Sequence, residues 1–148
     1  MAFQLKTAAF PPNGRIPEIY TCEGEDVPPP LVWSGAPAGT KSFALIVDDP
    51  DAPGGRFCHW AIFDIGPTVT SVGDEIPMGA QEAVNDFGRM GYGGPCPPPG
   101  HLHHYRFRLM ALDVARLNIP PHAKCQGVQH AAERHKLAES TFMGTYAR

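Results

Sequence analysis

The stretch SFALIVDDPDAPGGRFCHWAIFDI, residues 42–65, contains two apolar runs separated by an acidic break that is rich in proline and glycine. Ser42–Asp49 and His59–Ile65 carry apolar residues at both odd and even positions, as strands do when both faces of their sheet are covered. Residues 48–60 hold three aspartates, two prolines and two glycines, which are typical of an ordered turn. The stretch therefore predicts two consecutive antiparallel strands near the centre of a sheet, with an acidic loop at one edge.

A third strand is predicted at His103–Asp113, which reads HHYRFRLMALD. Tyr105 and Phe107 alternate there with Arg106 and Arg108, and this period of two indicates one face against a core and one face in water. We therefore expect this strand to be half exposed, unlike the two central strands.

The rest of the chain predicts loops and little helix. Seventeen prolines and 16 glycines gather in clusters such as VPPP and GYGGPCPPPG, which punctuate short runs of branched and aromatic residues. Gln126–Ala138 lacks proline and repeats apolar residues at helical spacing, so a helix is predicted there. A shorter helical turn is predicted at Val114–Leu117, and residues 142–148, FMGTYAR, are expected to form a short strand or an extended tail.

These patterns predict a mainly β fold with long ordered loops. No repeat and no shift in composition divides the chain, so residues 1–148 are expected to form a single domain. Lys and Arg total 12 against 15 Asp and Glu, without a basic block, which argues against nucleic acid as a partner. No export signal or membrane-spanning segment is recognisable, so we expect a protein of the cytoplasm without an integral membrane segment.

The four cysteines, Cys22, Cys58, Cys96 and Cys125, lie far apart and lack the short paired spacings of zinc sites. Free, reduced thiols are the expected state. An even number of cysteines also permits disulfides in an oxidising compartment, although the pairing does not follow from the sequence.

Three polar side chains are expected to meet at one edge of the sheet. Asp49 ends the first strand, and His59 begins the second on the face predicted to carry Ala61 and Phe63. If the third strand is antiparallel to the first, His103 arrives at the same edge. The proline-rich loops would then form the rim of a pocket.

Two imidazoles near one carboxylate form a hydrogen-bonding group that titrates close to neutrality and suits a small anion such as phosphate. Strand-end histidines are also common structural hydrogen bonders, so a purely structural role stays open. A third interpretation is a hydrolytic or acid–base enzyme with His59 or His103 as base and Asp49 orienting it, although no nucleophile is evident. The HLHH segment at residues 101–104 offers at most two metal ligands on one side of a strand, so neither a metal nor another cofactor is expected.

Several motifs in a fixed order resemble one known family. They are IPEIYTCEG, PPLVWSGAP, DDPDAP, HWAIFDI, YGGPCPPPG, the HxYxFxLxALD strand and the LAES…GTYAR ending. Together they span nearly the whole chain and resemble the phosphatidylethanolamine-binding protein (PEBP) family, in particular its bacterial and archaeal Raf-kinase-inhibitor-like branch. The resemblance implies a large antiparallel sheet, a smaller sheet packed against it, one or two peripheral helices and an anion pocket at one sheet edge.

The resemblance also assigns the pocket residues. Those implied to contact the ligand are Asp49, His59, Cys96, Pro97, His103 and Tyr105, and those implied to shape the pocket are Asp51, Pro53, Pro98 and His104. His104 replaces an arginine that the family usually carries, and strand parity points it away from the ligand. The expected consequence is the loss of an ion pair between that arginine and Asp51 or another rim carboxylate. We hypothesise that protonation of His104 partly restores the missing charge.

The function implied by the resemblance is binding of phosphate-bearing or other small anionic groups, rather than catalysis. It allows for a protein partner, of the kind that kinase or protease inhibitors have, and for a homodimer. An interaction scaffold with a vestigial pocket remains the alternative within the family.

Overall fold

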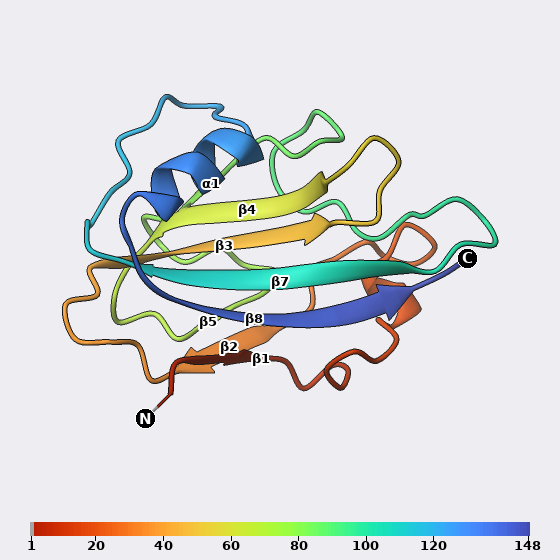
Figure 1. Cartoon of the computed structure of the whole chain (residues 1–148), viewed down its shortest axis with the longest axis horizontal. Helices are drawn as coiled ribbons and strands as arrows, with labels where there is room; N and C mark the ends of the chain where they lie inside the picture. Colours follow the sequence, from red (N-terminus) through yellow and green to blue (C-terminus); the bar gives the residue numbers. More distant parts are fainter. Residues whose placement is uncertain (1) are drawn as a thin grey trace.

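The computed structural model describes residues 2–148 and consists mainly of two antiparallel sheets (Figure 1). The strands are β1 Gln4–Lys6, β2 Leu31–Ser34, β3 Ser42–Asp49, β4 Phe57–Ile65, β5 Ser71–Val72, β6 Gln81–Glu82, β7 His103–Leu112 and β8 Lys136–Tyr146. A 3-10 turn, η1, covers Glu18–Tyr20, and the helix α1 covers Cys125–Glu133.

The larger sheet has the strand order β6-β4-β3-β7-β8, with every neighbouring pair antiparallel. β3 is the middle strand and is buried along its whole length, as the two-sided apolar pattern predicts. Its antiparallel neighbours β4 and β7 bring the end of β3 beside the beginning of each. The three predicted strand ends therefore meet at one edge of the sheet.

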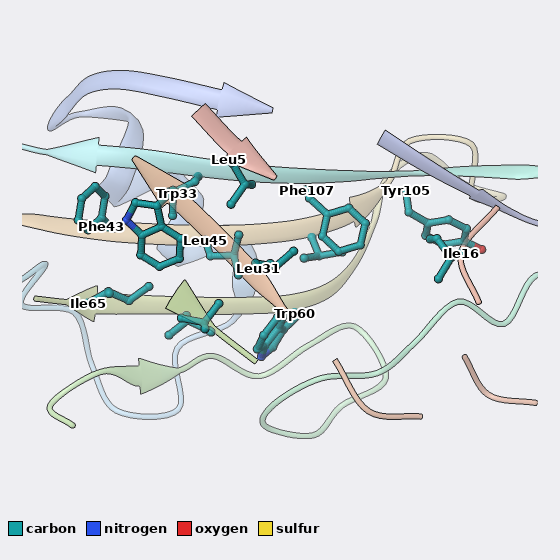
Figure 2. Close-up of a cluster of buried hydrophobic side chains, with 14 of the residues drawn as sticks. Leu5, Ile16, Leu31, Trp33, Phe43, Leu45, Trp60, Ile65, Tyr105 and Phe107 are labelled. Carbon is teal, nitrogen blue, oxygen red and sulfur yellow. The ribbon is translucent and has the colours of Figure 1, made fainter. Parts of the chain in front are cut away.

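The smaller sheet, β1-β2-β5, packs on one face of the larger sheet. Leu31 and Trp33 of β2 project toward Phe43 and Leu45 of β3, and the rings of Trp33 and Phe43 lie 5.4 Å apart in an edge-on arrangement (Figure 2). This apolar layer extends to Tyr105 at the edge where the candidate site lies. The main hydrophobic core thus forms one wall of that site.

Helix α1 covers the opposite face of the larger sheet through Val128 and Ala132. It is shorter than predicted and ends at Glu133, because Lys136 pairs with Leu112 of β7 and begins the eleven-residue strand β8. Long-range strand pairing here overrides the helix propensity of the local sequence. The expected short strand at the C-terminus is the second half of β8.

Strand β7 is not half exposed, and this prediction is wrong. Its residues from Phe107 to Leu112 are buried on both faces, because α1 and its flanking loop cover the second face. Arg108 is only 9% exposed, and its guanidinium donates hydrogen bonds to Glu133 and Glu139. Arg108, which alternates with apolar residues in the sequence, is therefore buried and ion-paired and does not indicate a solvent-exposed face.

The prediction of a helical turn at Val114–Leu117 is also wrong, because this segment is irregular. The backbone N–H of Leu117 donates to the Asp64 side chain at 2.9 Å instead of to a helical carbonyl. Asp64 lies at a bulge of β4 with φ +57°, so a long-range contact determines the local conformation.

The cysteines are paired, contrary to the expected free thiols. Disulfides join Cys22 to Cys96 and Cys58 to Cys125. Each bond connects residues about half the chain apart, which is why sequence spacing alone gave no sign of it. Within residues 2–148, no helix combines the length and apolar content needed to cross a bilayer.

Gly144 allows close packing between β8 and the N-terminal segment. A Cβ atom there would lie 2.7 Å from side-chain atoms of both Phe10 and Ile16, which are buried. We therefore expect Gly144→Ala to lower the free energy of unfolding by about 1–2 kcal/mol in a urea titration. Gly127→Ala is the matched control, because a Cβ at that helical position meets nothing within 4 Å and should be neutral or stabilising. Equal stability of the two variants would contradict this packing.

Candidate functional site

The acidic break after β3 makes three contacts with the beginning of β7. Asp48 lies on the α1 side of the sheet and accepts two hydrogen bonds from Arg106, at 2.8 and 3.0 Å. Asp49 faces the other way and contacts His103, with 2.5 Å between Oδ2 and Nδ1. Beyond the strand, Asp51 contacts residue 104. The three carboxylates therefore fix the loop to β7 and place Asp49 beside His103.

The pair of Asp49 and His103 is nearly enclosed, with 3% and 7% of the two residues exposed. The second oxygen of Asp49 accepts the backbone N–H of Asp51 at 2.8 Å, so both carboxylate oxygens have partners. A buried carboxylate held in this way orients the imidazole. The pair leaves Nε2 of His103 as the nitrogen free to meet a ligand.

His59 reaches the same place by a route that strand parity did not predict. In β4, Trp60 pairs with Val47 and Cys58 pairs with Asp48, so one residue is inserted between them as a bulge. Ala61 and Phe63, predicted to share a face with His59, lie instead on the α1 side of the sheet. The expected meeting of the three side chains is present, but the bulge, and not alternation, brings His59 to it.

The tautomer of neutral His59 follows from its partner. Its Nδ1 lies 2.7 Å from the backbone carbonyl of Gly93, which can only accept, so Nδ1 carries the hydrogen and Nε2 has the lone pair. Burial lowers the pKa of His59 below its ordinary value, and the Gly93 carbonyl and Asp49 only partly oppose this. His59 therefore contributes a neutral ring with an acceptor nitrogen.

Tyr105 lies between the two histidines. Its ring meets His59 edge-on at 5.3 Å and stacks on His103 at 6.5 Å, between ring centroids. Its hydroxyl is buried and has no hydrogen-bond partner among the described residues. Burial and the nearby charge of Asp49 raise the pKa of Tyr105, which keeps the phenol protonated.

The opposite wall is the proline-rich loop GPCPPPG, residues 94–100, which lies at the same end of the sheet as the C-terminus (Figure 1). Cys96 is tied to Cys22 by the disulfide, and Arg148 donates from Nε to the carbonyl of Pro97 at 2.7 Å. Prolines restrict the backbone, so this wall is stiff along its own length.

Asp51 and His104 lie on the rim and do not line the cavity. Both the backbone N–H and Nδ1 of His104 contact one oxygen of Asp51, at 2.8 and 2.7 Å. These hydrogen bonds, the side-chain one first, lower the pKa of Asp51. The contact to Asp51 that we expected to be lost with the family arginine is therefore made by His104. The proposed effect of His104 protonation on this contact stays a hypothesis.

Together these side chains enclose a cavity of about 110 Å³, with room for roughly three or four water molecules or one small oxyanion. The predicted site residues that line it are Asp49, Pro53, His59, Cys96, Pro97, Pro98, His103 and Tyr105. Sequence reasoning missed Ala52, Phe57 and the carbonyl of Gly93. Phe57 could have been predicted from its pairing with Asp49, but that pairing follows only once the bulge in β4 is known. Residues 2–148 contain no cluster of His, Cys, Asp or Glu suited to a metal ion.

Comparison with known proteins agrees with this architecture. The family model described as phosphatidylethanolamine-binding protein matches residues 6–147. The chain belongs to this family. The crystal structure of Escherichia coli YbcL, described as a member of the mammalian PEBP family, superposes with a TM-score of 0.94 at 34% identity, covering 99% of this chain and 98% of YbcL. The predicted mainly β fold with two packed sheets is thereby confirmed.

Sequence relatives within the family come from archaea and bacteria. A UPF0098 protein of Methanothermobacter thermautotrophicus is 47% identical over 150 residues, which cover 97% of this chain and 98% of the relative. LppC of Mycobacterium tuberculosis, named as a candidate lipoprotein, is 42% identical over 144 residues, which cover 96% of this chain and 71% of LppC. The chain thus spans nearly all of the archaeal relative and about 71% of LppC.

Proposed function

We propose that this PEBP-family chain binds small anions through a phosphate or phosphate-monoester group in the cavity between β3, β4, β7 and the proline-rich loop. The proposal rests on one observation: the Nδ1 atoms of His59 and His103 both have partners within the protein. His103 contacts Asp49 and His59 donates to the Gly93 carbonyl, which leaves two Nε2 atoms for one small cavity. Such a pair suits a single tetrahedral group.

The two Nε2 atoms would play different parts. His103, whose Nδ1 contacts Asp49, would donate from Nε2 to an anionic oxygen. Neutral His59 accepts at Nε2, so it would face the hydroxyl of a singly protonated phosphate. Tyr105 lines the cavity, and its buried hydroxyl has no partner among the described residues, so it is a further candidate donor to a ligand oxygen. The cavity therefore favours an oxyanion that carries one proton.

The binding should be weak for a bare anion. A few charge-assisted hydrogen bonds in a cavity open to water contribute about 4 kcal/mol, which corresponds to a dissociation constant of about 1 mM. A cavity of about 110 Å³ holds a headgroup and leaves the rest of a larger ligand outside. The site therefore implies recognition of phosphate groups and not of whole lipids.

The acceptor nitrogen of His59 gives a prediction about specificity. At pH 5.5, phosphoethanolamine should bind roughly tenfold or more tightly than sulfate, because a phosphate monoester with a second pKa near 6 is mostly singly protonated at this pH and can donate a proton to His59. Sulfate has no proton to donate, so one of its oxygens would face the lone pair on Nε2 of His59, and the two acceptors would repel each other. Calorimetric titration of both anions measures this ratio.

A variant separates this effect from general anion attraction. His59→Gln carries an amide that can donate to either anion, so the preference for phosphoethanolamine should shrink in this variant. Equal affinities for sulfate and phosphoethanolamine in the wild-type protein would contradict the assigned roles of the two histidines.

Two other functions have less support. An acid–base enzyme would use the hydrogen-bonded pair of Asp49 and His103. The one cysteine that lines the cavity, Cys96, is bonded to Cys22, so its sulfur is not free to act as a nucleophile. A scaffold for protein partners, or a homodimer, would leave the cavity unused. Retained binding of such a partner by an Asp49→Ala, His59→Ala double variant would favour the scaffold.

The single domain over residues 1–148 and the cytoplasmic location stay predictions. The two disulfides weigh against a reducing compartment, because cytosolic thiols are usually kept reduced outside hyperthermophiles. The relative LppC, named as a candidate lipoprotein, is a second reason to test the location directly.

A further inference from the structure

The two disulfides differ in their access to solvent. Cys58 and Cys125 are 3% and 1% exposed, and their bond lies in the core between β4 and α1. In the other pair, Cys22 is exposed and Cys96 is half-buried. A reductant in solution can therefore reach the second bond in the folded protein, whereas the first is shielded.

The accessible bond also holds a wall of the candidate anion site. Cys96 lines the cavity together with Pro97 and Pro98, while Cys22 lies outside it, after the η1 turn. The disulfide thus connects the cavity wall to a separate segment of the chain that precedes β2.

Few other bonds hold this wall. In Pro95–Pro99 only Cys96 has a backbone N–H, so the segment cannot form a regular hydrogen-bond ladder. Its carbonyls accept from the Cys22 N–H at 3.1 Å and from Arg148 at 2.7 Å. The first of these contacts is itself next to the disulfide. Gly94, before the segment, is buried and donates its N–H to Asp26 at 2.7 Å, whereas Gly100, after it, is exposed and donates to the Arg148 carbonyl at 3.1 Å.

We propose that the Cys22–Cys96 disulfide is a redox modification site, reduced by dithiol reductants, whose state sets the affinity of the adjacent cavity for phosphate groups. The proposal rests on the anion-binding function proposed above for that cavity. The buried Cys58–Cys125 bond keeps the fold while the accessible bond is opened.

Reduction of the Cys22–Cys96 bond is a thiol–disulfide exchange in which the dithiol supplies both electrons. A thiolate of the reductant attacks Sγ of the exposed Cys22, the bond to Cys96 breaks, and Cys96 leaves as a thiolate that takes a proton from water. The second thiol of the reductant loses its proton and attacks the mixed disulfide, which releases Cys22. The reductant ends as a disulfide, and the protein gains two thiols.

Reduction should weaken binding without unfolding the chain. The wall would keep the hydrogen bond to Arg148 but lose its covalent link to residue 22, so Cys96 and the prolines would no longer be held opposite His103. A ligand then has to order the loop on binding. We expect the dissociation constant for phosphate to rise by roughly threefold or more.

The test combines a chemical and a binding measurement on the full chain. The oxidised protein is treated with limiting dithiothreitol, alkylated and analysed by mass spectrometry, and parallel samples are titrated with phosphate by amide NMR. We expect alkylation at Cys22 and Cys96 before the other two cysteines, weaker phosphate binding, and recovery on reoxidation. Simultaneous alkylation of all four cysteines, or unchanged affinity after selective reduction, would overturn the proposal.

A variant distinguishes this regulation from the anion site itself. Cys22→Ser, Cys96→Ser should bind phosphate as weakly as the reduced wild-type protein and should not respond to dithiothreitol. If this variant binds phosphate as tightly as the oxidised wild-type protein, the proposal is contradicted, even if dithiothreitol reduces the Cys22–Cys96 bond selectively. Oxidised wild-type protein that binds no phosphate overturns the anion site, and with it this regulation, while the alkylation pattern still reports which bond is accessible.

Discussion

His103→Ala should abolish saturable phosphate binding. The variant removes the imidazole that we propose donates to the anion, and it leaves Asp49, a buried carboxylate, without its partner. A charge-assisted hydrogen bond contributes about 1.5–3 kcal/mol, so its loss weakens binding at least about tenfold. The repulsion between Asp49 and an incoming anion adds to this loss. From a starting point near 1 mM, the remaining binding would fall outside a practical titration.

The control for this variant is His101→Ala, two residues earlier in the same segment. His101 is exposed and does not line the cavity, so its removal should leave phosphate affinity unchanged. Amide spectra of both variants establish that they are folded. Phosphate binding by folded His103→Ala at wild-type affinity would refute the assigned role of His103.

Arg108→Met should cost about 2 kcal/mol of stability at neutral pH. Methionine fills most of the same volume, but it removes the buried guanidinium that hydrogen bonds to Glu139 and Glu133. The two carboxylates are partly exposed and keep Lys136 as a partner, so the loss is that of the charge-assisted hydrogen bonds. Urea unfolding measures the loss. Lys41→Met, which removes an exposed cation, should change stability by no more than about 0.5 kcal/mol.

The pH dependence of this effect has a definite sign. Hydrogen bonding to Arg108 lowers the pKa of Glu139 from its ordinary value of 4.5 to about 2. Because the folded-state pKa is the lower one, the ion pair stabilises the protein fully above pH 4.5, and this contribution is lost as the pH falls toward 2. The difference between wild type and Arg108→Met should therefore narrow over that interval. A difference that is constant from pH 7 to pH 2.5 would show that Arg108 acts through packing alone.

The sequence was sufficient for the parts of the fold that depend on local pattern. The two-sided apolar runs of β3 and β4 identified the centre of the sheet, which follows from alternation along a single sequence. The sequence placed Asp49 beside His103 only on the condition that β3 and β7 are antiparallel, as they are in the structure. The opposite wall, including Pro97, came from the family resemblance and not from alternation.

The features that were missed depend on contacts between distant residues. The bulge at His59 shifts the register of β4 by one residue, and no local signal distinguishes it from regular alternation. The burial of Arg108 depends on carboxylates of α1 and β8, and the early end of α1 depends on β8 pairing with β7. The disulfide at Cys96 likewise joins residues separated by 74 positions. Each needs the tertiary structure before it can be inferred.

The central claim is that the cavity bounded by Asp49, His59, Cys96 and His103 binds phosphate groups. The most direct test is an amide NMR titration of the oxidised wild-type protein with phosphate and with phosphoethanolamine at pH 6.5. We predict saturable shifts for both ligands, concentrated at these residues and at Tyr105, with dissociation constants of about 1 mM. Shifts that do not saturate, or that lie away from this edge of the sheet in the folded protein, would contradict the claim.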